Sequence, residues 1–147
     1  MTKILISISN FYQDVSTILL DSSKKVLKKN NLDYEQVIVP GAFELPSSIN
    51  MGLETFEYSG VVALGCVIKG ETSHYDIVTH ECARAIQDIS IYYSIPLGFG
   101  VLTVDNKQQA LDRAAKYAAN AANACIQMIK VKEQFMIYND KRNSRFN

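Results

Sequence analysis

Four runs of apolar, largely β-branched residues recur along the chain, and segments with helical spacing separate them. The runs are KILISI at 3–8, EQVIVP at 35–40, GVVALGCVI at 60–68 and PLGFGVLTV at 96–104. Runs that are apolar nearly throughout are typical of parallel strands covered on both faces. Each run therefore predicts a buried strand.

Helices are predicted between the strands, because apolar residues recur there three and four positions apart. The second helix spans Leu45 to Phe56, and the other two are marked by Val15, Ile18, Leu19, Val26 and Leu27 and by Val78, Cys82, Ala85, Ile86, Ile89 and Tyr93. An alanine-rich segment then predicts one long helix, or two joined, from about Lys107 to the region of Phe135. Asp105 and Gln108 fit a capping box at its start.

The alternation of strands and helices continues without a break in composition, which predicts one domain over residues 1–147. The fold class that follows is an α/β sandwich with a mostly parallel sheet and right-handed crossovers. The polar tail NDKRNSRFN, from about residue 139 to residue 147, is compatible with disorder.

Charge and cysteine content narrow the partners and the compartment. The 15 basic and 15 acidic residues cancel, so no sustained field favours a nucleic acid or an anionic membrane, and a small-molecule ligand is expected. Three cysteines without a C-x-x-C pair, Cys66, Cys82 and Cys125, are expected to be reduced core thiols. The first apolar run is too short for a signal peptide, and no stretch approaches the ~20 apolar residues of a membrane span. A cytoplasmic protein is expected.

Ligands of open parallel α/β sheets bind beyond the carboxyl ends of the strands, where loops lead into helices. This rule selects four stretches, each with a Phe, a His or a charged residue beside Gly, Pro or a turn. They are SNFY at 9–12, PGAFELP at 40–46, GCVIKGETSH at 65–74 and FGVLTVDN at 99–106.

The third stretch predicts a helix start that could bind phosphate. Ser73 and Asp76 fit a capping box, with Thr72 just outside it, so several backbone N–H groups are expected to point into the crevice. His74 then lies in the first turn, where an imidazole can donate or accept protons; a surface histidine is the alternative. His80 lies on another side of the helix and cannot share a metal with His74, so no metal site is predicted.

Four other side chains each leave two interpretations open. The Glu44 carboxylate could accept hydrogen bonds from a polyol or only complement a helix dipole. Phe11 and Phe99 either pack in the core or stack on a planar heterocycle. Arg113, inside the last predicted helix, is either solvated or reaches a phosphate with two hydrogen bonds.

Together, PGAFELP, GCVIKGETSHYDIV and PLGFGVLTVDNKQQALDRA resemble the signature segments of the 6,7-dimethyl-8-ribityllumazine synthases, which catalyse the penultimate step of riboflavin synthesis. The match runs in register from Phe11 to about Asn120. It implies a flavodoxin-like three-layer sandwich with a four-stranded parallel sheet. It also implies that 5-amino-6-(D-ribitylamino)uracil condenses with 3,4-dihydroxy-2-butanone 4-phosphate, losing phosphate and water, without a metal or redox cofactor.

The resemblance also assigns roles to residues of this chain. The ribitylaminouracil would be bound by Phe11, which stacks on the ring, by Ala42, Phe43 and Glu44 along the ribityl chain, and by the backbone of Cys66, Val67 and Ile68. Phe99 would close the ring pocket from a neighbouring subunit. The phosphate would lie at Glu71, Thr72 and Arg113, and His74 would transfer protons.

Two positions depart from the family pattern. Ala121, within AAKYAANAANA, occupies the usual position of a lysine, so either Lys116 substitutes for it or the phosphate subsite is weaker. Glu71 places an acid beside the phosphate, where backbone N–H groups can still bind the anion. Family members form pentamers, some of which build 60-subunit shells, so a homo-oligomer based on a pentamer is expected.

Two rival functions remain open at this point. One is a non-catalytic carrier that keeps the ring pocket, which Ala121 favours and the presence of both His74 and Arg113 opposes. The other is a phosphosugar enzyme that uses the same helix start, in which Phe11 and Phe99 would have no planar ring to stack on.

Overall fold

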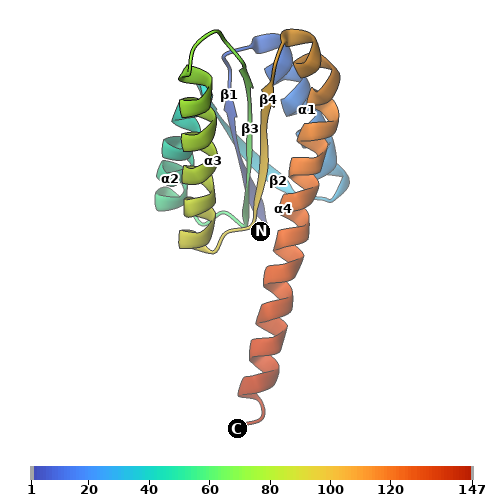
Figure 1. Ribbon diagram of the computed structural model, residues 1–147. Coiled ribbons are helices and arrows are strands. Elements are labelled where there is room, and N and C mark those ends of the chain that lie inside the picture. The colour runs from blue at the N-terminus through green and yellow to red at the C-terminus, as the bar shows by residue number, and fades with distance from the viewer. Residues whose placement is uncertain (1, 147) are drawn as a thin grey trace.

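Four strands form one parallel sheet in the order β2-β1-β3-β4, with helices on both faces (Figure 1). The computed structural model describes residues 2–146. The strands are β1 (Lys3–Ser9), β2 (Asp33–Val39), β3 (Gly60–Ile68) and β4 (Leu97–Val104). The four predicted strands and their parallel arrangement are confirmed.

Two layers of helices enclose the sheet. Helices α1 (Gln13–Lys29) and α4 (Lys107–Asn143) cover one face (Figure 1). A short 3₁₀ helix η1 (Ala42–Glu44), α2 (Leu45–Thr55) and α3 (His74–Tyr93) lie on the other. The expected flavodoxin-like sandwich is confirmed, and the last helix is one continuous element rather than two.

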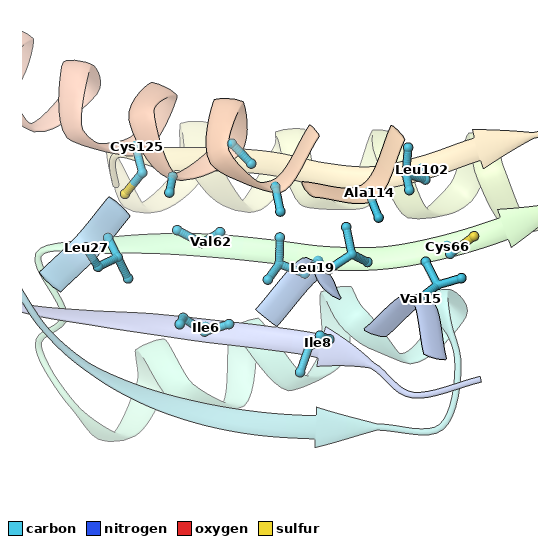
Figure 2. Packing of buried hydrophobic residues seen from close by; sticks show 14 of the residues in the cluster. Ile6, Ile8, Val15, Leu19, Leu27, Val62, Cys66, Leu102, Ala114 and Cys125 are labelled. Atoms are coloured by element: carbon cyan, nitrogen blue, oxygen red, sulfur yellow. The ribbon is translucent and has the colours of Figure 1, made fainter. Parts of the chain in front are cut away.

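Strand alternation divides the core into two clusters, because successive side chains of a strand point to opposite faces. Ile4, Ile6 and Ile8 of β1 pack under α1 and α4, as Figure 2 shows for Ile6 and Ile8. Leu5 and Val61 point the other way, into the cluster under α2 and α3. Both faces of the two central strands are therefore buried.

Helix α4 lies very close to β4 because small residues face each other there. A Cβ built on Gly98 would lie 1.8 Å from the carbonyl oxygen of Ala121, and one on Gly100 would lie 2.9 Å from the Ala121 Cβ. Ala110, Ala114 and Ala118 continue the same buried face of the helix. Ala121 thus faces the sheet and is 3% exposed.

Replacing Gly98 with alanine is expected to lower the free energy of unfolding by about 3 kcal/mol or more, because the added methyl group meets backbone that cannot rotate away. Urea unfolding followed by circular dichroism measures the change. Gly70→Ala is the matched control, since a Cβ at Gly70 meets nothing within 4 Å. A Gly98 variant as stable as that control would contradict the close approach.

Both predicted capping boxes are wrong in detail. Asn106, not Asp105, caps α4: its Oδ1 accepts from the Gln109 N–H at 2.9 Å, while Gln109 Oε1 accepts from the Asp105 N–H at 2.8 Å. At α3, Ser73 has helical angles (φ −69°, ψ −2°) and makes no side-chain cap. Capping by the side chain needs an extended backbone at that residue.

Strand β2 differs from the prediction of burial on both faces. It is an edge strand, and only Val39 of its residues is buried, whereas Ile38 is 56% exposed. The reason is topological, because helices cover the central strands and leave most of this edge open. Val37 and Ile38 therefore form an exposed apolar strip in a single chain.

The tail is also more ordered than its composition suggested. Helix α4 continues to Asn143, so most of the polar stretch from residue 139 is helical, and Asn147 lies outside the described residues. The distal half of α4 projects beyond the sheet (Figure 1). Among residues 2–146, no helix is both long and apolar enough to cross a membrane.

Candidate active site

A cavity of about 450 Å³ opens at the carboxyl ends of β1, β2 and β3. Three of the four selected loops build it, and its walls also include the first turns of α3. The lining residues are Phe11, Tyr12, Pro40, Gly41, Ala42, Phe43, Glu44, Cys66, Val67, Ile68, Gly70, Thr72, His74, Tyr75 and Val78. The predicted crevice at the strand ends is therefore present in a single chain.

The wall between β2 and α2 presents an acidic and an aromatic side chain side by side. Gly41 is extended (φ −149°, ψ 173°), and the chain then turns into η1, where the Glu44 N–H donates to the Gly41 carbonyl oxygen at 3.2 Å. Ala42 is buried, which leaves Phe43 and Glu44 exposed at the cavity. A carboxylate in this position can accept hydrogen bonds from hydroxyl groups of a ligand.

The end of β3 forms the inner wall of the cavity. Val67 pairs with Thr103 and Ile68 with Val104, so the sheet holds this backbone in place up to the cavity. Cys66 is 5% exposed, and burial raises the pKa of its thiol to about 11. A neutral thiol is a poor nucleophile, so this wall contributes shape rather than covalent chemistry.

All three cysteines are expected to resist alkylation in the native protein. Burial raises the pKa of Cys82 to about 11 and that of Cys125 to about 12, as it does for Cys66. A thiol with a pKa near 11 is ionised in only about one molecule in a thousand at pH 8. Iodoacetamide at that pH should therefore add no mass to the folded chain and three adducts in denaturant, measured by intact mass spectrometry. Rapid labelling of native Cys66 would show that the cavity exposes its sulfur.

His74 is the first residue of α3, and its exposed side chain lines the cavity. The His74 N–H points to Thr72 Oγ1 at 3.4 Å. Ser73 makes no side-chain cap, and its carbonyl oxygen accepts from the Asp76 and Ile77 N–H groups at 3.1 and 3.3 Å. An anion at this helix start would therefore meet the N–H groups of Ser73 and Tyr75. An imidazole beside an anion-binding helix start can exchange protons with a bound reactant.

Three predicted site residues lie outside this cavity. Thr72 lines it, but Glu71, in the same loop, does not. Phe99 sits within β4, paired with Ala63 and 36% exposed, and Arg113 is exposed on α4. Within residues 2–146, one chain does not bring Phe99 or Arg113 to the lining, so both roles stay predictions.

Tyr12 and Tyr75 are lining residues that the sequence argument missed. Each directly follows a residue that was singled out, Phe11 in one case and His74 in the other. Their position in the selected stretches was the available signal. A tyrosine next to a functional residue is more often a packing residue, which is why that signal is weak.

The fold and the cavity define a class: a flavodoxin-like α/β protein with a candidate small-molecule site at the carboxyl edge of its sheet. The sequence model of the 6,7-dimethyl-8-ribityllumazine synthases matches residues 1–133. The chain belongs to this family, whose members are transferases of riboflavin biosynthesis.

Relatives that bear the family name match most of the chain. The 6,7-dimethyl-8-ribityllumazine synthase 1 of Rhizobium meliloti (strain 1021) is 43% identical over 140 residues, 89% of this chain and 92% of the relative. The synthase of Paramagnetospirillum magneticum is 39% identical over 145 residues, 91% of this chain and 97% of the relative. A lipoprotein fragment from Peptoclostridium difficile 630 has a TM-score of 0.50 at 11% identity, covering 86% of this chain and 99% of the fragment, which reflects the fold alone.

Proposed function

We propose that the chain catalyses the reaction of its family: 5-amino-6-(D-ribitylamino)uracil and 3,4-dihydroxy-2-butanone 4-phosphate give 6,7-dimethyl-8-ribityllumazine, phosphate and water. One observation carries the proposal. Phe11, Glu44 and His74 come from three different connections of the sheet, and all three line the same cavity. A ring-stacking group, a polyol acceptor and a proton carrier therefore meet where the two reactants would meet.

The ribitylaminouracil is proposed to lie between the β1–α1 loop and the end of β3. The Phe11 ring is 70% exposed, so one face is open to stack on the pyrimidine. Ala42, Phe43 and Glu44 flank the ribityl chain, and the Glu44 carboxylate accepts hydrogen bonds from its hydroxyl groups. The backbone of Cys66, Val67 and Ile68 borders the ring. These contacts would orient the reacting amine toward His74.

Proton transfer is the proposed role of His74. The uracil amine attacks the ketone, and loss of water from the adduct gives an imine. Elimination of phosphate and tautomerisation follow, and ring closure by the ribitylamino nitrogen onto the remaining carbonyl expels a second water. Each step adds or removes a proton, which an imidazole can supply or accept. No covalent bond to the protein is needed. Holding two reactants together can itself contribute several kcal/mol, roughly up to ten.

The phosphate subsite is proposed at the start of α3. Backbone N–H groups after Thr72 and the helix dipole favour an anion there. The Thr72 hydroxyl is proposed to donate a hydrogen bond to the phosphate from the same chain that forms the cavity. Glu71 lies beside it in the same loop. Arg113 is proposed to reach the phosphate from a neighbouring subunit, where its guanidinium can form two parallel hydrogen bonds.

We infer that the active form is a homo-oligomer built on a pentamer. Phe99 and Arg113 lie outside the cavity of their own chain, so an active site that uses them needs a second copy. Two exposed apolar surfaces of the single chain are also expected to be buried against other copies. One is Val37 and Ile38 on β2. The other is a stripe on α4 with residues three and four positions apart, namely Met128, Val131, Phe135 and Tyr138. Light scattering separates a pentamer from a 60-subunit shell.

The reduced thiols favour a cytoplasmic location.

The direct test measures lumazine formation by absorbance from the two substrates. The rate with protein must exceed that of a protein-free blank, because an amine and a ketone condense unaided. A rate equal to the blank, with the uracil still bound, would favour the second candidate, a non-catalytic carrier. Ala121 is the observation that supports that candidate, since it faces β4 at the position where the family resemblance implies a lysine.

A further inference from the structure

Lys107 is an unusual residue for the place it occupies. It is the first residue of α4, directly after the turn that ends β4. A cation at a helix N-terminus opposes the helix dipole. The first turn of α4 holds no acidic residue that would offset this cost. The ammonium group instead contacts two groups of the β1–α1 connection.

The first of these groups is a carboxylate and the second an aromatic ring. Lys107 Nζ lies 2.9 Å from Asp14 Oδ2 and 5.3 Å from the centroid of the Tyr12 ring. The hydrogen bond from Lys107 lowers the pKa of the Asp14 carboxyl. Asp14 is in the first turn of α1, where the dipole of that helix favours an acid. The pair thus joins two helix starts and holds a cation near the face of Tyr12.

Tyr12 connects this ion pair to the cavity. Its ring lines the cavity together with Phe11, and the two ring centroids are 4.9 Å apart with an interplanar angle of 72°. Edge-to-face pairs of this kind favour one mutual orientation. Phe11 is 70% exposed, and its contact with the Tyr12 ring favours one direction of the Phe11 ring.

The backbone of this loop is held by separate contacts. The Asn10 N–H donates to the Val39 carbonyl oxygen at 2.9 Å. The buried Ser16 hydroxyl contacts the carbonyl oxygens of Ser9 and Tyr12 at 2.8 and 2.9 Å. Removing the Lys107 ammonium group is therefore expected to leave the backbone of the β1–α1 loop unchanged and to free only the side chains of Tyr12 and Phe11.

We propose that Lys107, paired with Asp14, is a positioning residue that holds Tyr12, and through it Phe11, in the orientation that stacks on the pyrimidine. The inference rests on the proposed function, because the pyrimidine is the substrate named there. The side chains of Lys107 and Asp14 are 44% and 53% exposed. Exposed ion pairs contribute little to folding, so the effect falls on ligand orientation.

The test titrates the ribitylaminouracil alone into the full-length protein by calorimetry and then measures steady-state kinetics. Lys107→Met should raise the dissociation constant of the uracil about three- to tenfold, the range of a weak ion pair plus a cation–π contact. The Michaelis constant of the butanone phosphate and the melting temperature should stay near wild type. Lys107→Arg should restore uracil binding, because a guanidinium keeps both contacts.

Two further variants isolate the pair. Asp14→Asn should weaken uracil binding in the same direction, and adding it to Lys107→Met should produce no further loss, since both remove one interaction. Lys130→Met is the matched control, an exposed lysine on the same helix outside the cavity lining. It should bind the uracil as wild type does.

Unchanged uracil binding in Lys107→Met would overturn the proposal. So would an equal loss for both substrates together with a lower melting temperature, which indicates a purely structural role. The proposed function fails separately, if wild type binds the uracil yet forms no lumazine; the binding comparison then still decides the role of Lys107. A wild-type protein that does not bind the uracil would overturn both.

Discussion

Replacing His74 with alanine is expected to lower the turnover number about ten- to a hundredfold, with the affinity for the ribitylaminouracil changing by about twofold or less. The side chain lines the cavity at the start of α3 and is exposed, so its removal takes away a proton carrier without opening the core. The loss is expected near the low end of general acid–base effects, because the first condensation also proceeds unaided. Stopped-flow and steady-state absorbance give the turnover number, and calorimetry gives the affinity.

His80→Ala is the matched control for this experiment. His80 is also exposed on α3 but lies six residues further along, and it does not line the cavity. Its variant should keep the wild-type turnover number. A His74 variant with an unchanged turnover number would remove the proposed proton-transfer role, and a parallel drop for both variants would point to a general disturbance of α3.

The second large effect concerns the sharing of the active site between subunits. Arg113→Ala should lower activity at limiting butanone phosphate about ten- to a hundredfold, the range expected for a lost charged hydrogen bond. If each site takes His74 from one chain and Arg113 from its neighbour, each impaired variant supplies the residue that the other lacks, so mixed oligomers contain some complete sites. Random assembly places both native residues together in about a quarter of the sites.

The mixture should therefore recover about a quarter of the wild-type activity after the two variants are unfolded together and refolded. The control mixes the same two proteins without the unfolding step, which leaves each oligomer homogeneous and should give only the summed residual activities. No recovery after joint refolding, with oligomers of the expected size, would mean that His74 and Arg113 act within one chain or that Arg113 has another role.

The sheet and most of the cavity could be predicted from sequence because they depend on strong local signals. Continuous apolar runs such as GVVALGCVI identify central strands, and parallel topology then fixes which loops meet at one edge. The rule that ligands bind beyond the carboxyl ends of the strands is sufficient to predict that His74, Phe11 and Glu44 lie at one site. The family resemblance added the chemistry, which periodicity does not contain.

The errors arose where the outcome depends on geometry that residue types do not determine. The cap of α4 shifted by one residue, because Asn106 has the extended backbone that a cap requires and its side chain accepts from the Gln109 N–H. Strand β2 has the apolar run of a buried strand but lies at the edge, where a single chain offers little cover. Its apolar residues are consistent with burial by another copy, which one sequence cannot display. Lys107 escaped notice because its partners, Asp14 and Tyr12, are distant in sequence.

The contact between Ala121 and the two glycines of β4 limits which substitutions position 121 can accept during evolution. The family resemblance implies a lysine at position 121, but a lysine there would drive its stem toward Gly100 and bury a charge, because a Cβ on Gly100 would already lie 2.9 Å from the Ala121 Cβ. The helix would have to shift or break first. The residue types at Ala121, Gly98 and Gly100 therefore constrain one another. A substitution that strengthens phosphate binding is expected at another position of the chain.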